Sequence, residues 1–289
     1  MAPKPVKKAK KVTTGRKKRN EDGSSSSQPP RLTSRDNETW WEERKETSFI
    51  IEKTIDPTID NYFKLSNAFA TLGWENMLTL TGTYFPELVR EFYANITEKS
   101  KKRFLVRSYV RGTEVEIDLT YLREFLDLRD PSHPIHYMIN RKGVVVDDRG
   151  YNIEETKGKF GVRDMLTRSF GLRWIRARLL IYLIGFNIVP RASGLNEIRN
   201  SDLYLVDRLI FGLPRIQKIA LAPIIIKCIR EVVASSRRDK NFVFPVLLSR
   251  IFIAQGVNTE GAEQRSTTQS DVFDHNKMST LRYQFIDGA

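Results

Sequence analysis

Residues 73–95, GWENMLTLTGTYFPELVREFYAN, restrict the fold of this chain more than any other stretch. Their second half carries apolar side chains every three or four positions, which is the spacing of a helix with one buried face. Pro86 suits the first turn of a helix, and Glu87 suits its positive end. We therefore expect a helix that starts near Pro86 and buries one apolar stripe: Phe85, Leu88, Val89, Phe92 and Ile96.

An antiparallel hairpin is predicted next. Residues 104–110 and 113–117 flank Arg111-Gly112, and a two-residue turn that ends in glycine is typical of hairpins. The second arm alternates glutamates with β-branched residues, which is the period of a half-buried strand. Asp118 is a suitable N-cap for a helix that follows the hairpin directly.

Apolar residues at helical spacing return in later runs, so helices should make up most of the body. The runs are residues 59–72, 172–186, 202–211, 215–233 and 245–255. Ser201 is a candidate N-cap, and Pro223 should kink or split its run because proline lacks an N–H. Strands do not alternate with helices, which argues against a parallel α/β sheet. The predicted class is mainly α with one small β-hairpin (α+β), a single compact helical domain with disordered N- and C-terminal tails.

The chain divides by composition into a basic arm, a folded body and a polar tail. Residues 1–45 contain few large apolar side chains and the run SSSSQPP, so they should be disordered. Residues 46–257 form the predicted domain, with an irregular polar loop at 132–158, and residues 258–289 are expected to be flexible. Residues 1–35 hold eleven Lys or Arg and two acids, so they supply +9 of the net charge of +13.

Two clusters of cations lie in this arm. They are Lys7, Lys8, Lys10 and Lys11, followed by Arg16, Lys17, Lys18 and Arg19. Exposed basic clusters on an extended chain fit a nuclear import receptor, and they also fit the phosphates of DNA or RNA without regard to sequence. The alternative is a solvated tail that only improves solubility. We predict a nuclear localisation signal, and therefore a nuclear protein.

A second basic run surrounds the start of the hairpin. It includes Lys101, Lys102, Arg103, Arg107 and Arg111. Strand alternation places Arg107, Tyr109 and Arg111 on one face, where cations could hold phosphates while the ring stacks on a base. Glu114 and Glu116 could instead neutralise this face. We favour an ordinary charged surface here.

The densest arginines precede and begin the run at 172–186. They are Arg163, Arg168, Arg173, Arg176 and Arg178. Arg173 and Arg176 are three residues apart, so they would share a helix face that could bind phosphate. Ion pairs within the body would use the same charges, and we favour that interpretation. The candidate partners are Asp164, Glu197 and Asp202.

The acidic residues do not indicate an enzyme. A transposase-like nuclease needs several carboxylates that converge on Mg²⁺. Strand alternation directs Glu114, Glu116 and Asp118 toward solvent, and Asp147-Asp148 lie in a polar loop. We therefore predict a protein without catalytic residues.

No metal, cofactor or membrane partner is predicted. His133 and His136 lack further ligands nearby, and Cys228 occupies an apolar run, as a small core residue would. No glycine-rich phosphate loop is present. The apolar runs 179–189 and 219–233 fall short of the roughly 18 uninterrupted apolar residues of a spanning helix, so they should be buried helices.

Several short motifs follow one another along the body. They are Gly73-Trp74, residues 89–96 and 110–115, Trp174, residues 188–190, Asn196, Ile198, Phe244-Pro245 and Gly256-Val257. Their order and spacing over residues 50–257 resemble the "putative plant transposon protein" domain. The resemblance implies a retroelement-derived protein, gag-like in self-association or partner binding, and it supplies no catalytic residues. We expect a non-enzymatic nuclear protein whose arm binds nucleic acid weakly. The alternative is a degenerate or active transposase-like, Mg²⁺-dependent nuclease.

Overall fold

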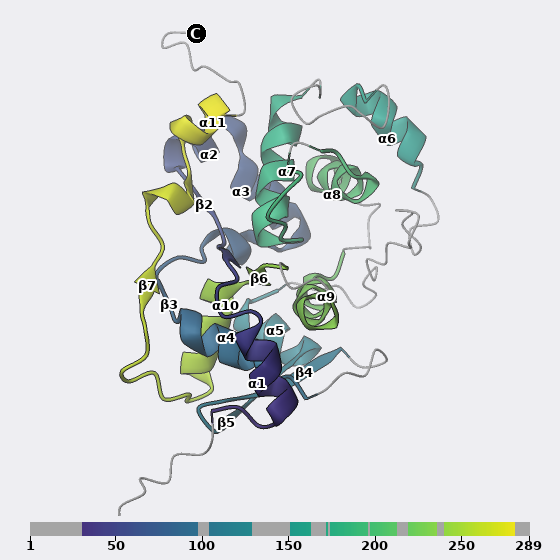
Figure 1. Cartoon of the computed structure of the whole chain (residues 1–289). Helices are drawn as coiled ribbons and strands as arrows, with labels where there is room; N and C mark the ends of the chain where they lie inside the picture. Colours follow the sequence, from purple (N-terminus) through teal and green to yellow (C-terminus); the bar gives the residue numbers. More distant parts are fainter. Residues whose placement is uncertain are drawn as a thin grey trace, which may run out of the picture.

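The computed structural model describes residues 31–97, 104–128, 151–162, 172, 174–195, 197–212, 219–235 and 240–280. Within these ranges, eleven helices form most of the body and the strands pair only two at a time (Figure 1). The prediction of a mainly helical protein is therefore confirmed. The helices are α1 (Arg35–Glu42), α2 (Pro57–Phe63), α3 (Leu65–Leu72), α4 (Pro86–Ala94), α5 (Leu119–Phe125), α6 (Ile153–Phe160), α7 (Ile175–Asn187), α8 (Asn200–Phe211), α9 (Leu221–Ala234), α10 (Pro245–Ala254) and α11 (His275–Thr280).

The predicted hairpin is present. β4 (Leu105–Val110) runs antiparallel to β5 (Thr113–Asp118), and Arg111 and Gly112 take positive φ angles of 48° and 78° in the turn. Two left-handed residues in a two-residue turn match the twist of paired strands. Asp118 accepts a hydrogen bond from the N–H of Tyr121 at 2.7 Å and caps α5, as predicted.

Three further strand pairs join segments that are far apart in the sequence, and the sequence did not predict how these segments pair. They are β1 (Phe49–Ile50) with β6 (Phe242–Val243) and β2 (Thr54–Ile55) with β8 (Val272–Phe273), both parallel, and β3 (Thr83–Tyr84) with β7 (Arg265–Ser266), antiparallel. A two-residue strand is too short for a period-two pattern to reveal it. These pairs attach segments near both ends of the described chain to the helical body.

Two buried polar residues between β1 and β2 connect this short segment to two helices. Glu52 accepts the N–H groups of Val246 (3.2 Å) and Leu247 (2.9 Å) in the first turn of α10, which have no partner inside their own helix. The N–H of Lys53 donates to Oδ1 of Asn187, and Nδ2 of Asn187 donates to the carbonyl of Lys53, both at 2.7 Å. The segment therefore fixes the start of α10 against the end of α7.

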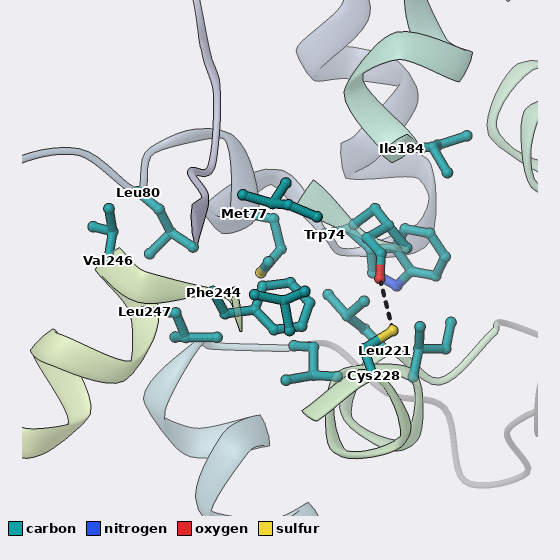
Figure 2. Packing of buried hydrophobic residues seen from close by; sticks show 14 of the residues in the cluster. Trp74, Met77, Leu80, Ile184, Leu221, Cys228, Phe244, Val246 and Leu247 are labelled. Carbon is teal, nitrogen blue, oxygen red and sulfur yellow. Dashed lines mark hydrogen bonds between the residues drawn. The ribbon is translucent and has the colours of Figure 1, made fainter. Parts of the chain in front are cut away.

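One continuous apolar core links these elements. In Figure 2, Trp74, Met77, Phe244 and Cys228 extend toward the same interior. The thiol of Cys228 lies 3.8 Å from the main-chain oxygen of Ile188, and burial raises the pKa of that thiol to about 12. Cys228 is thus a protonated core residue, as its apolar neighbours in the sequence indicated.

The long apolar runs lie in α7 and α9, and both helices contribute largely buried side chains to this core. Helix α7 packs against α8 and α3, while α9 contacts the hairpin and α5. No helix in the described part of the chain has the length and apolar character needed to cross a membrane.

Two of the expected helices differ from their prediction because of local backbone geometry. The run 59–72 forms two helices, since Lys64 between them adopts a left-handed conformation with φ of 52°. Helix α9 begins at Leu221, so Pro223 lies in its first turn instead of kinking it. A proline there removes no helical hydrogen bond, because the first N–H groups have no partner inside the helix.

Two other local predictions are wrong. Ser201 is not the N-cap of α8, because the helix starts after Arg199, whose N–H donates to Oδ2 of Asp202 at 3.1 Å. The expected irregular loop at 132–158 contains the start of α6, where Asn152 accepts the N–H groups of the first turn. A good N-cap therefore outweighs the polar composition of that segment.

The predicted boundaries of the arm and the tail also change. Residues 258–280 are not a flexible tail, because they supply β7, β8 and α11 and bury Phe273 completely. Asp271 also forms a 2.6 Å ion pair with Lys53. At the other end, residues 31–45 include α1, which packs against α4. The folded body therefore extends beyond residues 46–257 on both sides.

Candidate interaction surfaces

The cations of the predicted arm, residues 7–19, lie outside the described residues, and the structure shows only where the arm joins the body. Asn95 fixes this point. Its buried side chain accepts the N–H of Thr33 at 3.1 Å and donates to the main-chain oxygens of Arg31 (2.8 Å) and Tyr109 (2.9 Å). The chain therefore meets the body between the end of α4 and the hairpin.

Arg31 itself belongs to the body. Its guanidinium pairs with Glu87 and, at 3.3 Å, with the buried Glu91, and it lies 4.3 Å from the centre of the Trp41 ring. Burial raises the pKa of Glu91, while the N–H of Arg111 and the charge of Arg31 act in the opposite direction. Arg31 thus fixes the segment before α1 against α4.

The hairpin cations make contacts within the protein. Arg107 lies between Glu114 (3.0 Å) and Glu116 (2.5 Å), which belong to the neighbouring strand. Arg111 donates to the main-chain oxygens of Asn258 and Glu260. The remaining members of this predicted patch, Lys101, Lys102 and Arg103, lie outside the described residues. The described part of the hairpin therefore has two arginines against three carboxylates, those of Glu114, Glu116 and Asp118.

The outer side of β5 is acidic. Glu114, Glu116 and Asp118 line an open hollow of about 460 Å³ together with Tyr121 and Gln255. The side-chain amide of Gln255 makes paired hydrogen bonds with the main chain of Glu116, at 3.0 Å and 2.7 Å, as a neighbouring strand would. This face repels polyanions, and its strand edge is partly closed.

The two described arginines near the start of α7 donate to main-chain oxygens. Arg176 donates to the main-chain oxygen of Lys64 at 2.8 Å, and Arg178 donates to that of Leu172. Asp202, an expected partner, instead forms a buried 2.8 Å ion pair with Arg191. Arg163, Arg168, Arg173 and Asp164 lie outside the described residues. Arg176 has no ion pair in the described part of the protein, and partial burial lowers its pKa.

Three helix ends bring a group of aromatic rings together, a feature that the sequence did not predict. Phe160 ends α6, Trp174 precedes α7 and Phe211 ends α8. The rings of Trp174 and Phe211 are 5.4 Å apart, and the buried Phe160 lies 5.8 Å and 6.1 Å from them. We call Trp174, Ile175, Arg176, Phe211 and Lys159 the aromatic surface. Figure 1 shows α6, α7 and α8 side by side at this end of the body.

The described residues contain no group of three His, Cys, Asp or Glu side chains placed to hold a metal ion. His133, His136, Asp147 and Asp148 lie outside the described ranges. The buried carboxylates described above, Glu52 and Asp271, make hydrogen bonds that support the fold.

Comparison with known families gives a match to the central part of the chain. A family model described as "Putative plant retrotransposon-related domain" matches residues 70–258, which is more than half of the chain. No curated protein and no solved structure matches the chain. The matched region contains the hairpin and the helices from α4 to α10, whereas the arm and the segment containing β7, β8 and α11 lie outside it.

Proposed function

Because this chain belongs to the plant retrotransposon-related domain family, we propose that it is a non-enzymatic nuclear protein that binds nucleic acid through its basic arm. The cations of residues 7–19 hold phosphates of DNA or RNA and do not read sequence. The helical body associates with protein partners or with a second copy of the chain.

The unequal distribution of charge supports the proposal most directly. Residues 1–35 carry +9 of the net charge of +13. In the described body, Arg107 and Arg111 are bonded to neighbouring groups, and β5 presents an acidic face. A polyanion is therefore attracted to the arm more strongly than to the described hairpin.

The arm is tested by substituting its eight cations with glutamine in the full chain. We expect affinity for a DNA duplex at low salt to fall by roughly 100-fold or more, because most phosphate contacts are lost. Fluorescence anisotropy measures this change, and Lys45→Gln with Lys227→Gln, two exposed body cations, is the matched control. Unchanged affinity in the arm variant would contradict the proposal, as would Mg²⁺-dependent cleavage of the duplex in the same reaction.

Nuclear import follows from the same residues if an import receptor binds them in an extended conformation. Residues 1–35 should concentrate a fused cytosolic reporter in the nucleus, provided that the reporter is too large to diffuse through nuclear pores. The glutamine-substituted arm provides the control. Equal distribution of the two fusions would show that the arm does not direct import.

Association of the body should use side-chain surfaces, since the hairpin edges are largely occupied. On β4, the carbonyl of Leu105 accepts from Arg230 and the carbonyl of Arg107 accepts from the N–H of Thr97. On β5, Gln255 covers part of the edge. Addition of a strand from a partner is therefore disfavoured at this sheet. Sedimentation velocity on the full chain tests self-association, which a monomer at every concentration would contradict.

A further inference from the structure

The aromatic surface exposes large apolar side chains on a rigid base. Phe211 is 50% exposed, Trp174 37% and Ile175 39%, whereas Phe160 beneath them is fully buried. The three aromatic rings contact one another, so the exposed side chains are held in place by packing. Aromatic side chains gathered at one place on a surface indicate a binding site more often than scattered ones do.

Two cations, Lys159 and Arg176, lie at the edge of this surface. Lys159 lies 5.5 Å from the centre of the Phe211 ring, although Glu155 (3.1 Å) and Asp207 (3.8 Å) share its charge. Arg176 has no ion pair in the described part of the chain; one of its terminal nitrogens donates to the main-chain oxygen of Lys64, and its buried Nε has no hydrogen-bond partner there. The charge of Asp60 acts on Arg176 without an ion pair between them, so an anion beside the guanidinium would add a charge-assisted hydrogen bond.

We propose that the aromatic surface binds single-stranded nucleic acid, with bases stacked on Trp174 and Phe211 and a phosphate near Arg176. Unpaired bases expose the flat faces that such rings bind, whereas a duplex keeps its bases stacked inside. The two cations at the edge match the phosphates of a nucleic acid better than a second copy of this chain, whose net charge is +13. The inference rests on the proposed function and adds a preference for single strands to binding by the arm.

The test compares single-stranded and duplex oligonucleotides of equal length, with the full chain and fluorescence anisotropy at fixed salt. Stacking contributes about 1–3 kcal/mol per base, so Phe211→Ala should weaken single-strand binding by about tenfold and leave duplex binding unchanged. Trp174→Ala and Arg176→Gln should act in the same direction. Ile253→Ala is the control, since Ile253 is another exposed apolar residue (57%) on α10, away from this surface.

The glutamine-substituted arm separates this inference from the proposed function. That variant should lose affinity for both forms of DNA but retain the ratio between them. The inference fails, and the proposed function stands, if Phe211→Ala and Trp174→Ala proteins with normal melting temperatures keep the wild-type ratio of single-strand to duplex affinity. A further outcome would also overturn the inference. If the arm variant shows no preference for single strands over duplex, and a poly-glutamate peptide displaces the single strand from it, the aromatic surface binds acidic peptides instead. A full chain that binds neither form would overturn the proposed function.

Discussion

Glu52 shows how one residue can couple two distant parts of the chain. Its carboxylate is fully buried and accepts two N–H groups at the start of α10. Burial raises the pKa of Glu52 from 4.5 to about 7, while the N–H groups of Leu247 and Val246 and the charge of Arg250 act in the opposite direction. The sequence did not indicate this role, because a lone glutamate beside a two-residue strand carries no pattern.

This raised pKa predicts a specific dependence of stability on pH. Between pH 4.5 and about 7 the unfolded chain releases the Glu52 proton and the native protein retains it, so rising pH favours unfolding. The stabilisation of the native protein by protonated Glu52 is complete below pH 4.5 and is lost as pH rises through about 7. Between these two pH values the free energy of unfolding should fall by about 1.4 kcal/mol per pH unit.

Urea denaturation at several pH values checks this prediction. Glu52→Gln should be less stable at low pH because its amide N–H₂ faces an N–H donor, but this part of the pH dependence should disappear. Glu38→Gln, at an exposed position on α1, should keep the wild-type dependence. The assignment fails if Glu52→Gln loses stability with pH as steeply as the wild type.

At the scale of elements, two-residue strands hold residues 258–280 on the body. Only a few of these residues, among them Phe273 and Met278, have large buried apolar side chains, so composition alone predicts a tail. The attachment depends on β7, β8 and the buried pair between Lys53 and Asp271. Burial raises the pKa of Asp271, but hydrogen bonds from Lys53 and Thr268 outweigh it and hold that pKa below its usual value.

Asp271→Asn should therefore destabilise the protein, since it leaves the Lys53 ammonium buried without its counter-charge. We expect a loss of about 3 kcal/mol in the free energy of unfolding at neutral pH. Tryptic cleavage after Arg265 and Lys277 should become faster, because the segment detaches more often. Glu260→Gln, at an exposed position in the same segment, should change neither measurement. Wild-type stability and cleavage rates in Asp271→Asn would show that the pair does not attach the segment.

Over the whole molecule, the spacing of apolar residues predicted the helices and strands that are long enough to show a repeating buried face. The hairpin, α4 and α10 follow from such patterns and from Asp118 and two prolines at helix starts. The aromatic surface could not be predicted in this way, because Trp174 and Phe211 lie at the ends of apolar runs and resemble core residues in sequence. Their exposure depends on how three helix ends meet.

The arm cations, residues 7–19, lie outside both the family match and the described residues, so their proposed role depends on their charge. The most direct test is the dependence of DNA affinity on salt for the full chain and for the chain with eight arm glutamines. Each phosphate contact contributes about −0.9 to the slope of log K against log salt concentration for duplex DNA. We predict a steep slope for the full chain and a much shallower one for the variant. Equal slopes would contradict the central claim that the arm supplies the phosphate contacts.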